Sequence, residues 1–188
     1  MSQLRWLQAE FGLGRGARVL QKTPMSFDAA QWEILAPGCG GEVVMGAPGV
    51  YRDVERLIEA VVRYEVTMLQ CVPTLLQALV GTEEFADCAS LEWVFSGGEA
   101  LSRSLAKQCV EVLPRCELVN LYGPTECTIN ASAFRVARDA VGDGPNSISI
   151  GSPVAGTEFH IVDDEWNPVG VGRSVSCISV VCSWRGGI

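Results

Sequence analysis

Short apolar segments alternate with amphipathic helical patterns along the chain, and this alternation most constrains the fold. Helices are expected at residues 29–36, 52–64, 73–80 and 102–112. The second has apolar residues at the spacing of one buried helical stripe, namely Val54, Leu57, Ile58, Val61 and Val62. Strands are expected at 17–21, 42–45, 66–71, 92–95 and 117–120. This order predicts an α/β fold, a layered and mostly parallel sheet with crossover helices. Further strands at 128–136 and 157–162 predict a β-rich C-terminal part.

Charge and cysteine usage exclude several classes of protein. The 188 residues carry 14 Lys and Arg against 22 Asp and Glu, a net charge of −8. Nucleic acids and anionic membranes bind clustered cations, so neither is an expected partner. No apolar run approaches the ~20 residues of a membrane span, and no signal peptide is recognisable. The eight cysteines form no Cys-x-x-Cys pair and His160 is the only histidine, so we expect reduced, core-packed thiols in a cytoplasmic protein rather than a zinc site.

Two loops at the ends of predicted strands have residues suited to a nucleotide. Gly97-Gly98-Glu99 lets the backbone approach a flat ligand, although a tight turn with Glu99 in a first helical turn is the alternative. The segment Asn120–Glu126 combines a stacking ring, a hydroxyl and a hard carboxylate in Tyr122, Thr125 and Glu126. That combination fits a nucleotide held with Mg²⁺, and an exposed Gly-Pro turn is the alternative.

Four segments resemble the amino-acid-activating (adenylation) domains of nonribosomal peptide synthetases, which belong to the adenylate-forming enzymes. NLYGPTECTI (120–129) resembles their core nucleotide motif, and FSGGEALS (95–102) resembles the loop beside the adenine. Residues 19–45 resemble the segment around the substrate aspartate, and residues 148–169 resemble the run that follows the core motif. The resemblance extends from about Leu4 to Val169 and implies part of the large N-terminal subdomain of such an enzyme.

The resemblance implies a role for individual residues. Asp28 matches the aspartate that pairs with the substrate α-ammonium, whereas Asp28-x-x-Gln31 read locally is a helix cap. Thr125 matches the hydroxyl near the α-phosphate and Glu126 the Mg²⁺ carboxylate, so both are assigned to catalysis. The substrate pocket would comprise Asp28, Ala29, Trp32, Gln70, Phe95, Gly97, Leu121, Ile129 and Asn130. The nucleotide site would comprise Gly97, Gly98, Glu99, Asn120, Tyr122, Gly123 and Thr125.

The implied reaction joins ATP and an amino acid into aminoacyl-AMP and pyrophosphate, and then loads the acyl group on the phosphopantetheine thiol of a carrier protein. Gln70 and Asn130 are the amides of an otherwise mostly apolar pocket, which favours a polar, uncharged side chain, with glutamine the first candidate. An acyl- or aryl-CoA ligase is an alternative that Asp28 disfavours. A non-catalytic nucleotide-binding remnant or pseudogene product is another.

The sequence also departs from the family pattern. The phosphate loop, the ribose-binding aspartate and the C-terminal subdomain with its catalytic lysine have no counterpart here, so we expect a truncated fragment with little adenylation activity alone. Residues 1–170 are expected to form a partial AMP-binding domain, with an α/β core at 17–136 and the start of a β-rich subdomain at 137–170. Residues 171–188 diverge, through either a reading-frame change or an apolar edge strand at 175–181.

Overall fold

The structure is a computed structural model that describes residues 2–127, 129–142, 144–163, 165, 167–169 and 177–181. The expected domain boundary at Gly170, and residues 171–176 and 182–188 of the expected tail, lie outside the described residues. Among the described residues, no helix is both long enough and apolar enough to cross a membrane.

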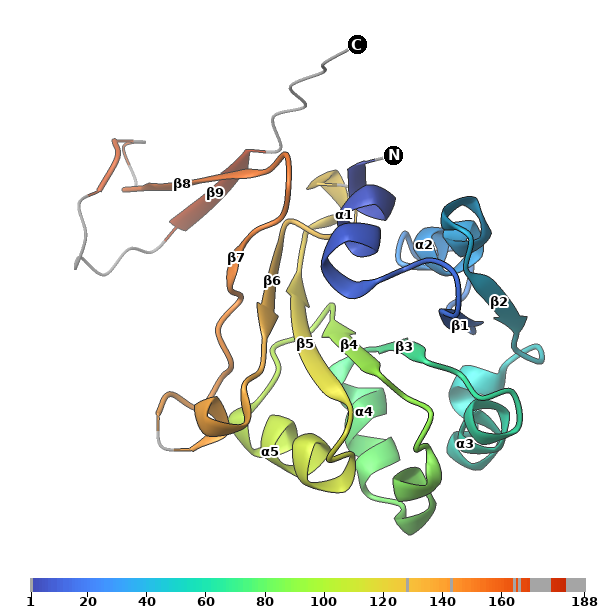
Figure 1. Ribbon diagram of the computed structural model, residues 1–188. Coiled ribbons are helices and arrows are strands. Elements are labelled where there is room, and N and C mark those ends of the chain that lie inside the picture. The colour runs from blue at the N-terminus through green and yellow to red at the C-terminus, as the bar shows by residue number, and fades with distance from the viewer. Residues whose placement is uncertain are drawn as a thin grey trace.

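The elements follow the predicted alternation (Figure 1). The helices are α1 (Ser2–Phe11), α2 (Ala30–Leu35), α3 (Val54–Arg63), α4 (Pro73–Val80) and α5 (Arg103–Val112). The strands are β1 (Arg18–Gln21), β2 (Glu42–Met45), β3 (Met68–Cys71), β4 (Trp93–Gly97), β5 (Glu117–Tyr122), β6 (Ser132–Arg135), β7 (Ser152–Pro153), β8 (Glu158–Val162) and β9 (Cys177–Val181). Short 3₁₀ helices occupy Ala36–Cys39, Val50–Arg52, Glu83–Asp87, Thr125–Cys127 and Arg138–Val141.

The main sheet has seven strands in the order β2-β1-β3-β4-β5-β6-β7. Strands β1 to β5 pair in parallel, whereas β6 and β7 are antiparallel. The predicted α/β class with a mostly parallel sheet is therefore confirmed. The chain winds outward from β1 to β2 and then crosses back to β3, so the strand order reverses between β1 and β3. In open parallel sheets ligands bind at such a reversal, beyond the carboxyl ends of the strands.

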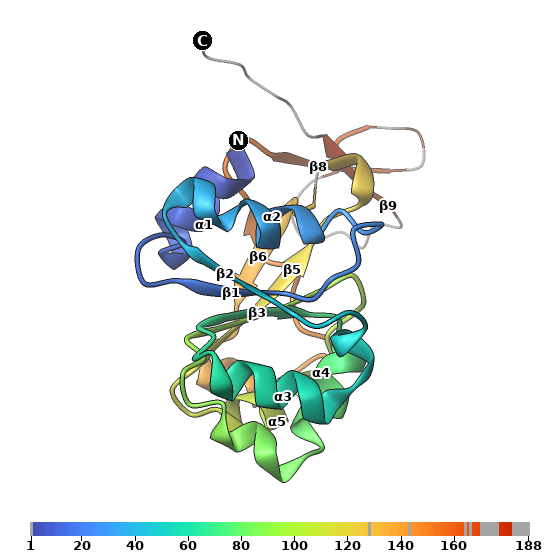
Figure 2. The same ribbon diagram turned by 90° about the vertical axis from the view of Figure 1, so that its right-hand side faces the viewer.

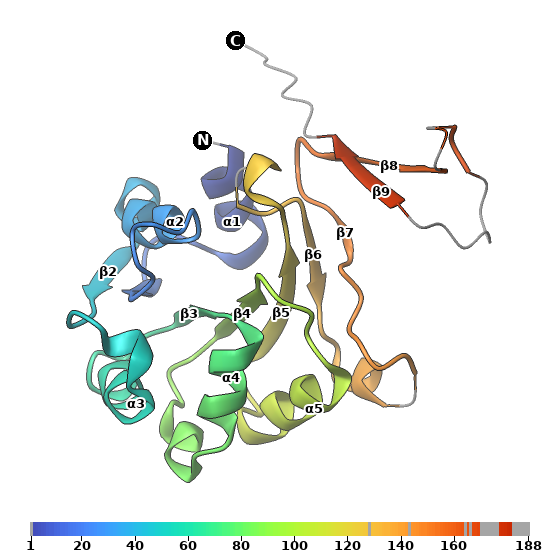
Figure 3. The same ribbon diagram turned by 180° about the vertical axis from the view of Figure 1, so that it is seen from behind.

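Helices cover both faces of the sheet and make two separate apolar cores (Figures 2 and 3). The helices α3, α4 and α5 pack on one face, where the core includes Leu57, Leu69, Leu76, Val94 and Leu105. The helices α1 and α2 pack on the other face, where the core includes Trp6, Phe11, Trp32, Phe95 and Val119. Adjacent residues such as Val94 and Phe95 enter opposite cores because side chains alternate along a strand.

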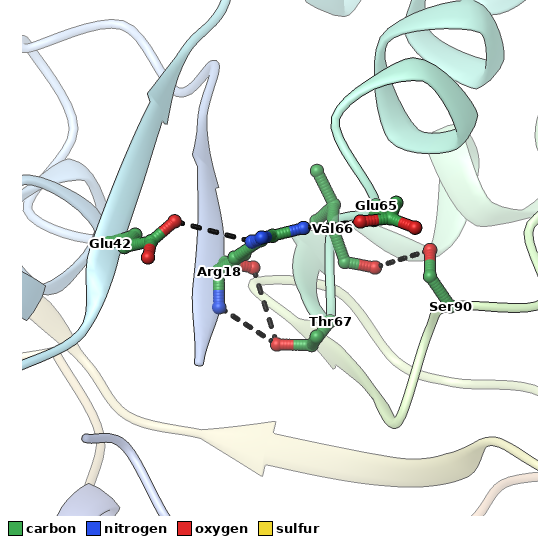
Figure 4. Close-up of polar contacts among 6 residues, drawn as sticks. All are labelled: Arg18, Glu42, Glu65, Val66, Thr67 and Ser90. Carbon is green, nitrogen blue, oxygen red and sulfur yellow. Dashed lines mark hydrogen bonds and ion pairs between the residues drawn. The ribbon is translucent and has the colours of Figure 1, made fainter. Parts of the chain in front are cut away.

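The junction between β1 and β3 has little backbone pairing, since Val19 and Met68 are its one registered pair. Polar contacts at the amino ends of the strands supplement it (Figure 4). The Arg18 amide donates to Thr67 Oγ1 over 2.9 Å, and its guanidinium contacts Glu42 on β2 at 3.2 Å and Glu65 at 2.6 Å. These ion pairs are largely exposed and add little stability. They do join β2 and the turn before β3 through one arginine.

Several boundaries differ from the sequence-based expectations. The helix expected to stop before Pro37 continues as a 3₁₀ turn to Cys39, where Gly40 ends it at φ 87°. The strand expected at 128–136 is wrong in its first part, because β6 begins only at Ser132. Ile129 adopts a φ of 76° and the Ala131 amide turns back to the Tyr122 carbonyl. Strand β9 pairs with all five residues of β8, so a pairing strand does occupy part of the expected tail.

Candidate functional site

A cavity of about 320 Å³ lies where β1, β3, β4 and β5 end. It therefore occupies the point of strand-order reversal described above. Its lining combines apolar side chains with a few polar groups, the usual character of a small-molecule site. The lining residues are Lys22, Thr23, Pro24, Phe27, Asp28, Ala29, Tyr51, Gln70, Cys71, Val72, Leu75, Gly97, Gly98, Leu121, Gly123, Ile129 and Asn130.

Nine residues that the sequence placed in the substrate or nucleotide site line this one cavity. They come from four separate parts of the chain and are Asp28, Ala29, Gln70, Gly97, Gly98, Leu121, Gly123, Ile129 and Asn130. Parallel pairing explains part of this convergence, because Gln70 is in register with Phe95, and Gly97 with Leu121. The sheet therefore delivers the three strand ends to one edge.

Asp28 lies at the cavity wall just before α2, and its side chain is half-buried. The helix-cap interpretation is wrong for its carboxylate, because α2 has no side-chain cap. The Gln31 amide donates instead to the backbone carbonyl of Asp28, over 2.9 Å. In the described part of the chain, the carboxylate itself has no hydrogen bond or ion pair. It is therefore available to a cationic ligand.

Lys22 is the other charged residue of the lining, and a buried partner neutralises it. Its ammonium lies 3.8 Å from Glu33 on α2, with the two side chains 5% and 0% exposed. Glu33 also accepts from the Lys22 amide, the Thr23 amide and the Thr23 hydroxyl at 3.2, 3.0 and 2.6 Å. Burial raises the pKa of Glu33, and Lys22 and Thr23 oppose that rise. The charge left without a partner at the cavity wall is therefore negative.

Two predicted pocket residues, Trp32 and Phe95, lie behind the wall rather than in it. Both are almost completely buried in the core beneath α1 and α2. Their rings meet edge to face, with centroids 5.6 Å apart. The indole nitrogen of Trp32 donates a hydrogen bond to Oε1 of Gln70, which does line the cavity. Trp32 therefore acts on the cavity through Gln70.

Glu99 and Asn120, expected beside the adenine, each have a structural contact. The Glu99 carboxylate accepts from the amide and hydroxyl of Thr74 over 3.1 and 2.6 Å, at the first turn of α4. Glu99 therefore interacts with the start of α4, and not with the helix that follows it in sequence. The Asn120 amide nitrogen donates to the Ser149 carbonyl over 2.9 Å and is buried. Neither side chain lines the cavity.

Tyr122 is the last residue of β5, Thr125 and Glu126 lie in the 3₁₀ turn that follows, and all three are outside the cavity lining. Tyr122 and Glu126 are exposed, Tyr122 at 37%, and Thr125 is exposed as well. Their strand and 3₁₀ turn place an aromatic ring, a hydroxyl and a carboxylate along one short segment next to the cavity residue Gly123. Glu126 is able to supply one oxygen ligand to Mg²⁺, which takes the rest of its ligands from phosphates and water.

Backbone geometry explains two glycines of the predicted motifs. A Cβ on Gly123 would lie 2.3 Å from the Ile129 carbonyl oxygen and 2.8 Å from the Ala131 amide nitrogen. The chain segment 129–131 therefore passes directly against Gly123, and only glycine leaves it room. Gly98 instead has a φ of 86°, and a Cβ on it would meet nothing nearer than Val72 Cγ1, at 3.5 Å. The first glycine is required for space and the second for conformation.

Several lining residues were absent from the sequence-based site. Lys22, Thr23 and Pro24 directly follow β1, so the rule that ligands gather at strand ends was sufficient to find them. Tyr51 comes from the segment between β2 and α3, and no local pattern marks it. Cys71 ends β3, and burial raises the pKa of its thiol to about 12, so it is a neutral wall group rather than a nucleophile.

Comparison with known proteins agrees with this geometry. The family profile of the AMP-binding enzymes matches residues 1–174. The chain belongs to the AMP-binding enzyme family. Two relatives of this AMP-binding chain are indigoidine synthases, from Dickeya dadantii at 58% identity over 173 residues and from Streptomyces lavendulae at 60% over 174. Each alignment covers 92% of this chain, which spans 12% and 14% of the respective relatives.

Solved adenylation enzymes share the fold of this AMP-binding chain. The nonribosomal peptide synthetase FmoA3 superposes with a TM-score of 0.82 at 27% identity, over 89% of this chain and 18% of that one. A form of it bound to alpha-methyl-L-serine-AMP gives a TM-score of 0.81 at 26% identity, over 88% of this chain and 19% of that one. The resemblance to nonribosomal peptide synthetase adenylation domains is thereby confirmed, and the acyl-CoA ligase alternative is not favoured.

Proposed function

We propose that the cavity is the amino-acid site of an ATP-dependent adenylating ligase of the nonribosomal peptide synthetase type. The observation that carries this proposal is the partner-free Asp28 carboxylate at the wall of a mostly apolar cavity, among the residues that the structure describes. A half-buried carboxylate there selects a ligand with an ammonium group, because a charge-assisted hydrogen bond in such a site is strong. The paired Lys22 does not compete, since Glu33 already neutralises it.

The nucleotide would lie on the segment beyond the cavity, against the Gly97–Gly98 turn. In this proposal Tyr122 stacks on the adenine, the Thr125 hydroxyl donates to the α-phosphate, and Asn120 and Glu99 support the surrounding backbone through their contacts with Ser149 and Thr74. Glu126 holds the Mg²⁺, which neutralises phosphate charge when bound.

Catalysis by such a site is positioning and charge neutralisation. Asp28 fixes the ammonium end of the amino acid, which leaves the carboxylate directed to the nucleotide segment, where it displaces pyrophosphate from ATP. The aminoacyl-AMP would then pass its acyl group to the phosphopantetheine thiol of a peptidyl carrier protein. This complete reaction is proposed for the longer proteins of which such a chain forms a small part.

Glutamine is the proposed substrate, or another amino acid with a polar and uncharged side chain. Gln70 and Asn130 are the side-chain amides of the lining, and their polar atoms are not all engaged within the described chain. Buried amides favour a ligand that hydrogen-bonds to them. The rest of the lining, including Leu75, Leu121 and Ile129, is apolar and adds no charge.

Calorimetric binding to the 188-residue chain tests the amino-acid site. The ligands are the non-hydrolysable analogue L-glutaminyl-sulfamoyl-adenosine and its counterpart without the α-amino group. We expect the amino analogue to bind more tightly, and Asp28→Asn to remove ~10- to 100-fold of that advantage, the range for a hydrogen bond to a charged group.

Asp139→Asn is the matched control, because it removes the same charge from a 3₁₀ helix outside the cavity lining. It should leave the preference for the amino analogue unchanged. Equal binding of the two analogues to the unaltered chain would rule out Asp28 as the ammonium site. Tighter binding of the analogue without the amino group would favour a ligase for plain carboxylic acids.

A further inference from the structure

The hydrogen bond between Trp32 and Gln70 fixes which end of the Gln70 amide faces the cavity. Trp32 is on α2, 2% exposed, and packed edge to face against Phe95. Its indole nitrogen is a donor only, so the atom that it meets must be the amide oxygen of Gln70. The reverse orientation of the amide would set two donors against each other. The ring is too well packed to move aside.

The amide nitrogen of Gln70 is consequently the group left for a ligand. Gln70 is part of the cavity lining, and among the described residues its nitrogen has no hydrogen-bond partner. It is also not among the fully buried polar atoms left unsatisfied, so it is open to the cavity. The cavity therefore presents a fixed N–H donor at the end of β3.

We propose that Trp32 is a positioning residue that sets the polarity of the amino-acid pocket, so that the pocket accepts a side chain with a neutral hydrogen-bond acceptor at the Gln70 position. This inference rests on the proposed function, since it assumes that an amino acid occupies the cavity. A side-chain carbonyl, as in a carboxamide, satisfies the Gln70 N–H group. An amine of similar length brings a second donor and leaves both groups unpaired.

Charge narrows the class of side chain further. An acidic side chain also offers an acceptor, but its carboxylate would be buried without a counter-ion, because Lys22 is already paired with Glu33 and Asp28 is negative. Asn130 has no comparable restraint on its side chain, because its one described bond is accepted by its backbone oxygen from Gln3. The Asn130 amide is free to present either end. Gln70 is thus the discriminating amide and Asn130 the adaptable one.

The test compares three sulfamoyl-adenosine analogues that carry glutamine, ornithine and norleucine. These side chains are similar in length and differ in having an acceptor, a cationic donor or no polar group. Calorimetry on the 188-residue chain should show the glutaminyl analogue bound at least ~10-fold more tightly than the ornithyl analogue. Trp32→Phe should reduce that ratio towards one, because the Gln70 amide is then free to rotate.

Two further variants separate polarity from packing. Gln70→Glu keeps an acceptor for the Trp32 indole and turns a carboxylate oxygen to the cavity, so the preference should reverse in favour of ornithine. Trp93→Phe removes another indole N–H from the same aromatic cluster, where Trp93 packs on Phe11 and Phe95, and should leave the ratio unchanged. The Gln70→Glu result does not depend on whether Trp32→Phe folds.

The possible outcomes distinguish this inference from the proposed function. If the chain binds the glutaminyl, ornithyl and norleucyl analogues equally, the amino-acid site stands and the role of Trp32 is overturned. The role of Trp32 is likewise overturned if a folded Trp32→Phe keeps the full ratio, and the role of the Gln70 amide is overturned if Gln70→Glu fails to reverse it. If no analogue binds, the proposed function fails and this inference fails with it.

Discussion

Replacement of Gly123 by alanine should destabilise the chain more than any change at the neighbouring motif glycines. The added Cβ would lie 2.3 Å from the Ile129 carbonyl oxygen, whereas ordinary van der Waals contact begins at 3.4 Å. The atoms nearest to the Cβ are backbone atoms, so no side chain is able to rotate away. Segment 129–131 would have to move by roughly 1 Å.

That movement has a calculable cost. It breaks the hydrogen bond from the Ala131 amide to the Tyr122 carbonyl, at 2.7 Å, and strains the bond from the Val154 amide to the Ala131 carbonyl, at 2.9 Å. Each such bond contributes about 0.5–1.5 kcal/mol, and overpacking adds about 1–3 kcal/mol. The free energy of unfolding should therefore fall by about 3 kcal/mol.

Urea unfolding of the 188-residue chain, followed by circular dichroism, measures this loss. Gly98→Ala is the matched control, since its Cβ meets nothing nearer than 3.5 Å and the cost comes from a φ of 86° alone. A left-handed alanine costs about 1–2 kcal/mol. If Gly123→Ala were no less stable than Gly98→Ala, the close approach of segment 129–131 would not be the reason for the glycine.

Two further predictions concern buried polar groups. Ser96→Ala should be neutral or stabilise the chain by up to about 1 kcal/mol, because the Ser96 hydroxyl is buried without a partner in the described part of the chain. Ser132→Ala should destabilise the chain by about 1–2 kcal/mol, because the Ile150 carbonyl loses a hydrogen bond of 2.7 Å. Urea unfolding of both variants checks the contrast, and an equal loss of unfolding free energy in the two would contradict it. Glu33 should make the stability of the chain depend on pH. Burial raises its pKa in the folded state above the ordinary value of 4.5. Its contribution to stability is therefore complete below pH 4.5 and is lost as the pH rises through the raised pKa. The stability of the natural chain relative to Glu33→Gln should thus fall as pH rises from 4.5 towards neutrality, and a rise would show that Lys22 and the Thr23 bonds outweigh burial.

Much of the fold could be predicted from the sequence because its elements have strong local patterns. The apolar stripe of α3 and the Pro73 start of α4 were sufficient to place both helices. Helix α1 was not predicted. Its apolar residues Trp6, Leu7 and Phe11 are explained only by the sheet face on which they pack. That face is assembled from residues distant in sequence, which no local window contains.

The resemblance selected nine of the residues that line the cavity, but it did not show how each residue is placed relative to the cavity wall. Motif resemblance selected Gln70 and Trp32 as equivalent pocket residues, whereas the structure has one in the wall and the other behind it. Strand order and side-chain alternation decide that difference, and both depend on tertiary structure. The helix-cap interpretation of Asp28 failed for a related reason, since α2 starts one residue too late for the Asp28 carboxylate to act as its cap.

The sparse backbone pairing between β1 and β3 affects how firmly the two walls of the cavity are held at a fixed distance. The walls that bear Lys22 and Gln70 stand on either side of that junction. It is joined by one registered backbone pair, by the bond from the Thr67 amide to the Arg18 carbonyl at 2.9 Å, and by the side-chain contacts of Arg18. A molecule bound in the cavity would contact both walls at the carboxyl ends of the strands, whereas Arg18 joins the same strands at their amino ends. Occupancy of the cavity and the lateral cohesion of the sheet are then linked quantities, so a ligand that contacts both walls should oppose the separation of β1 from β3.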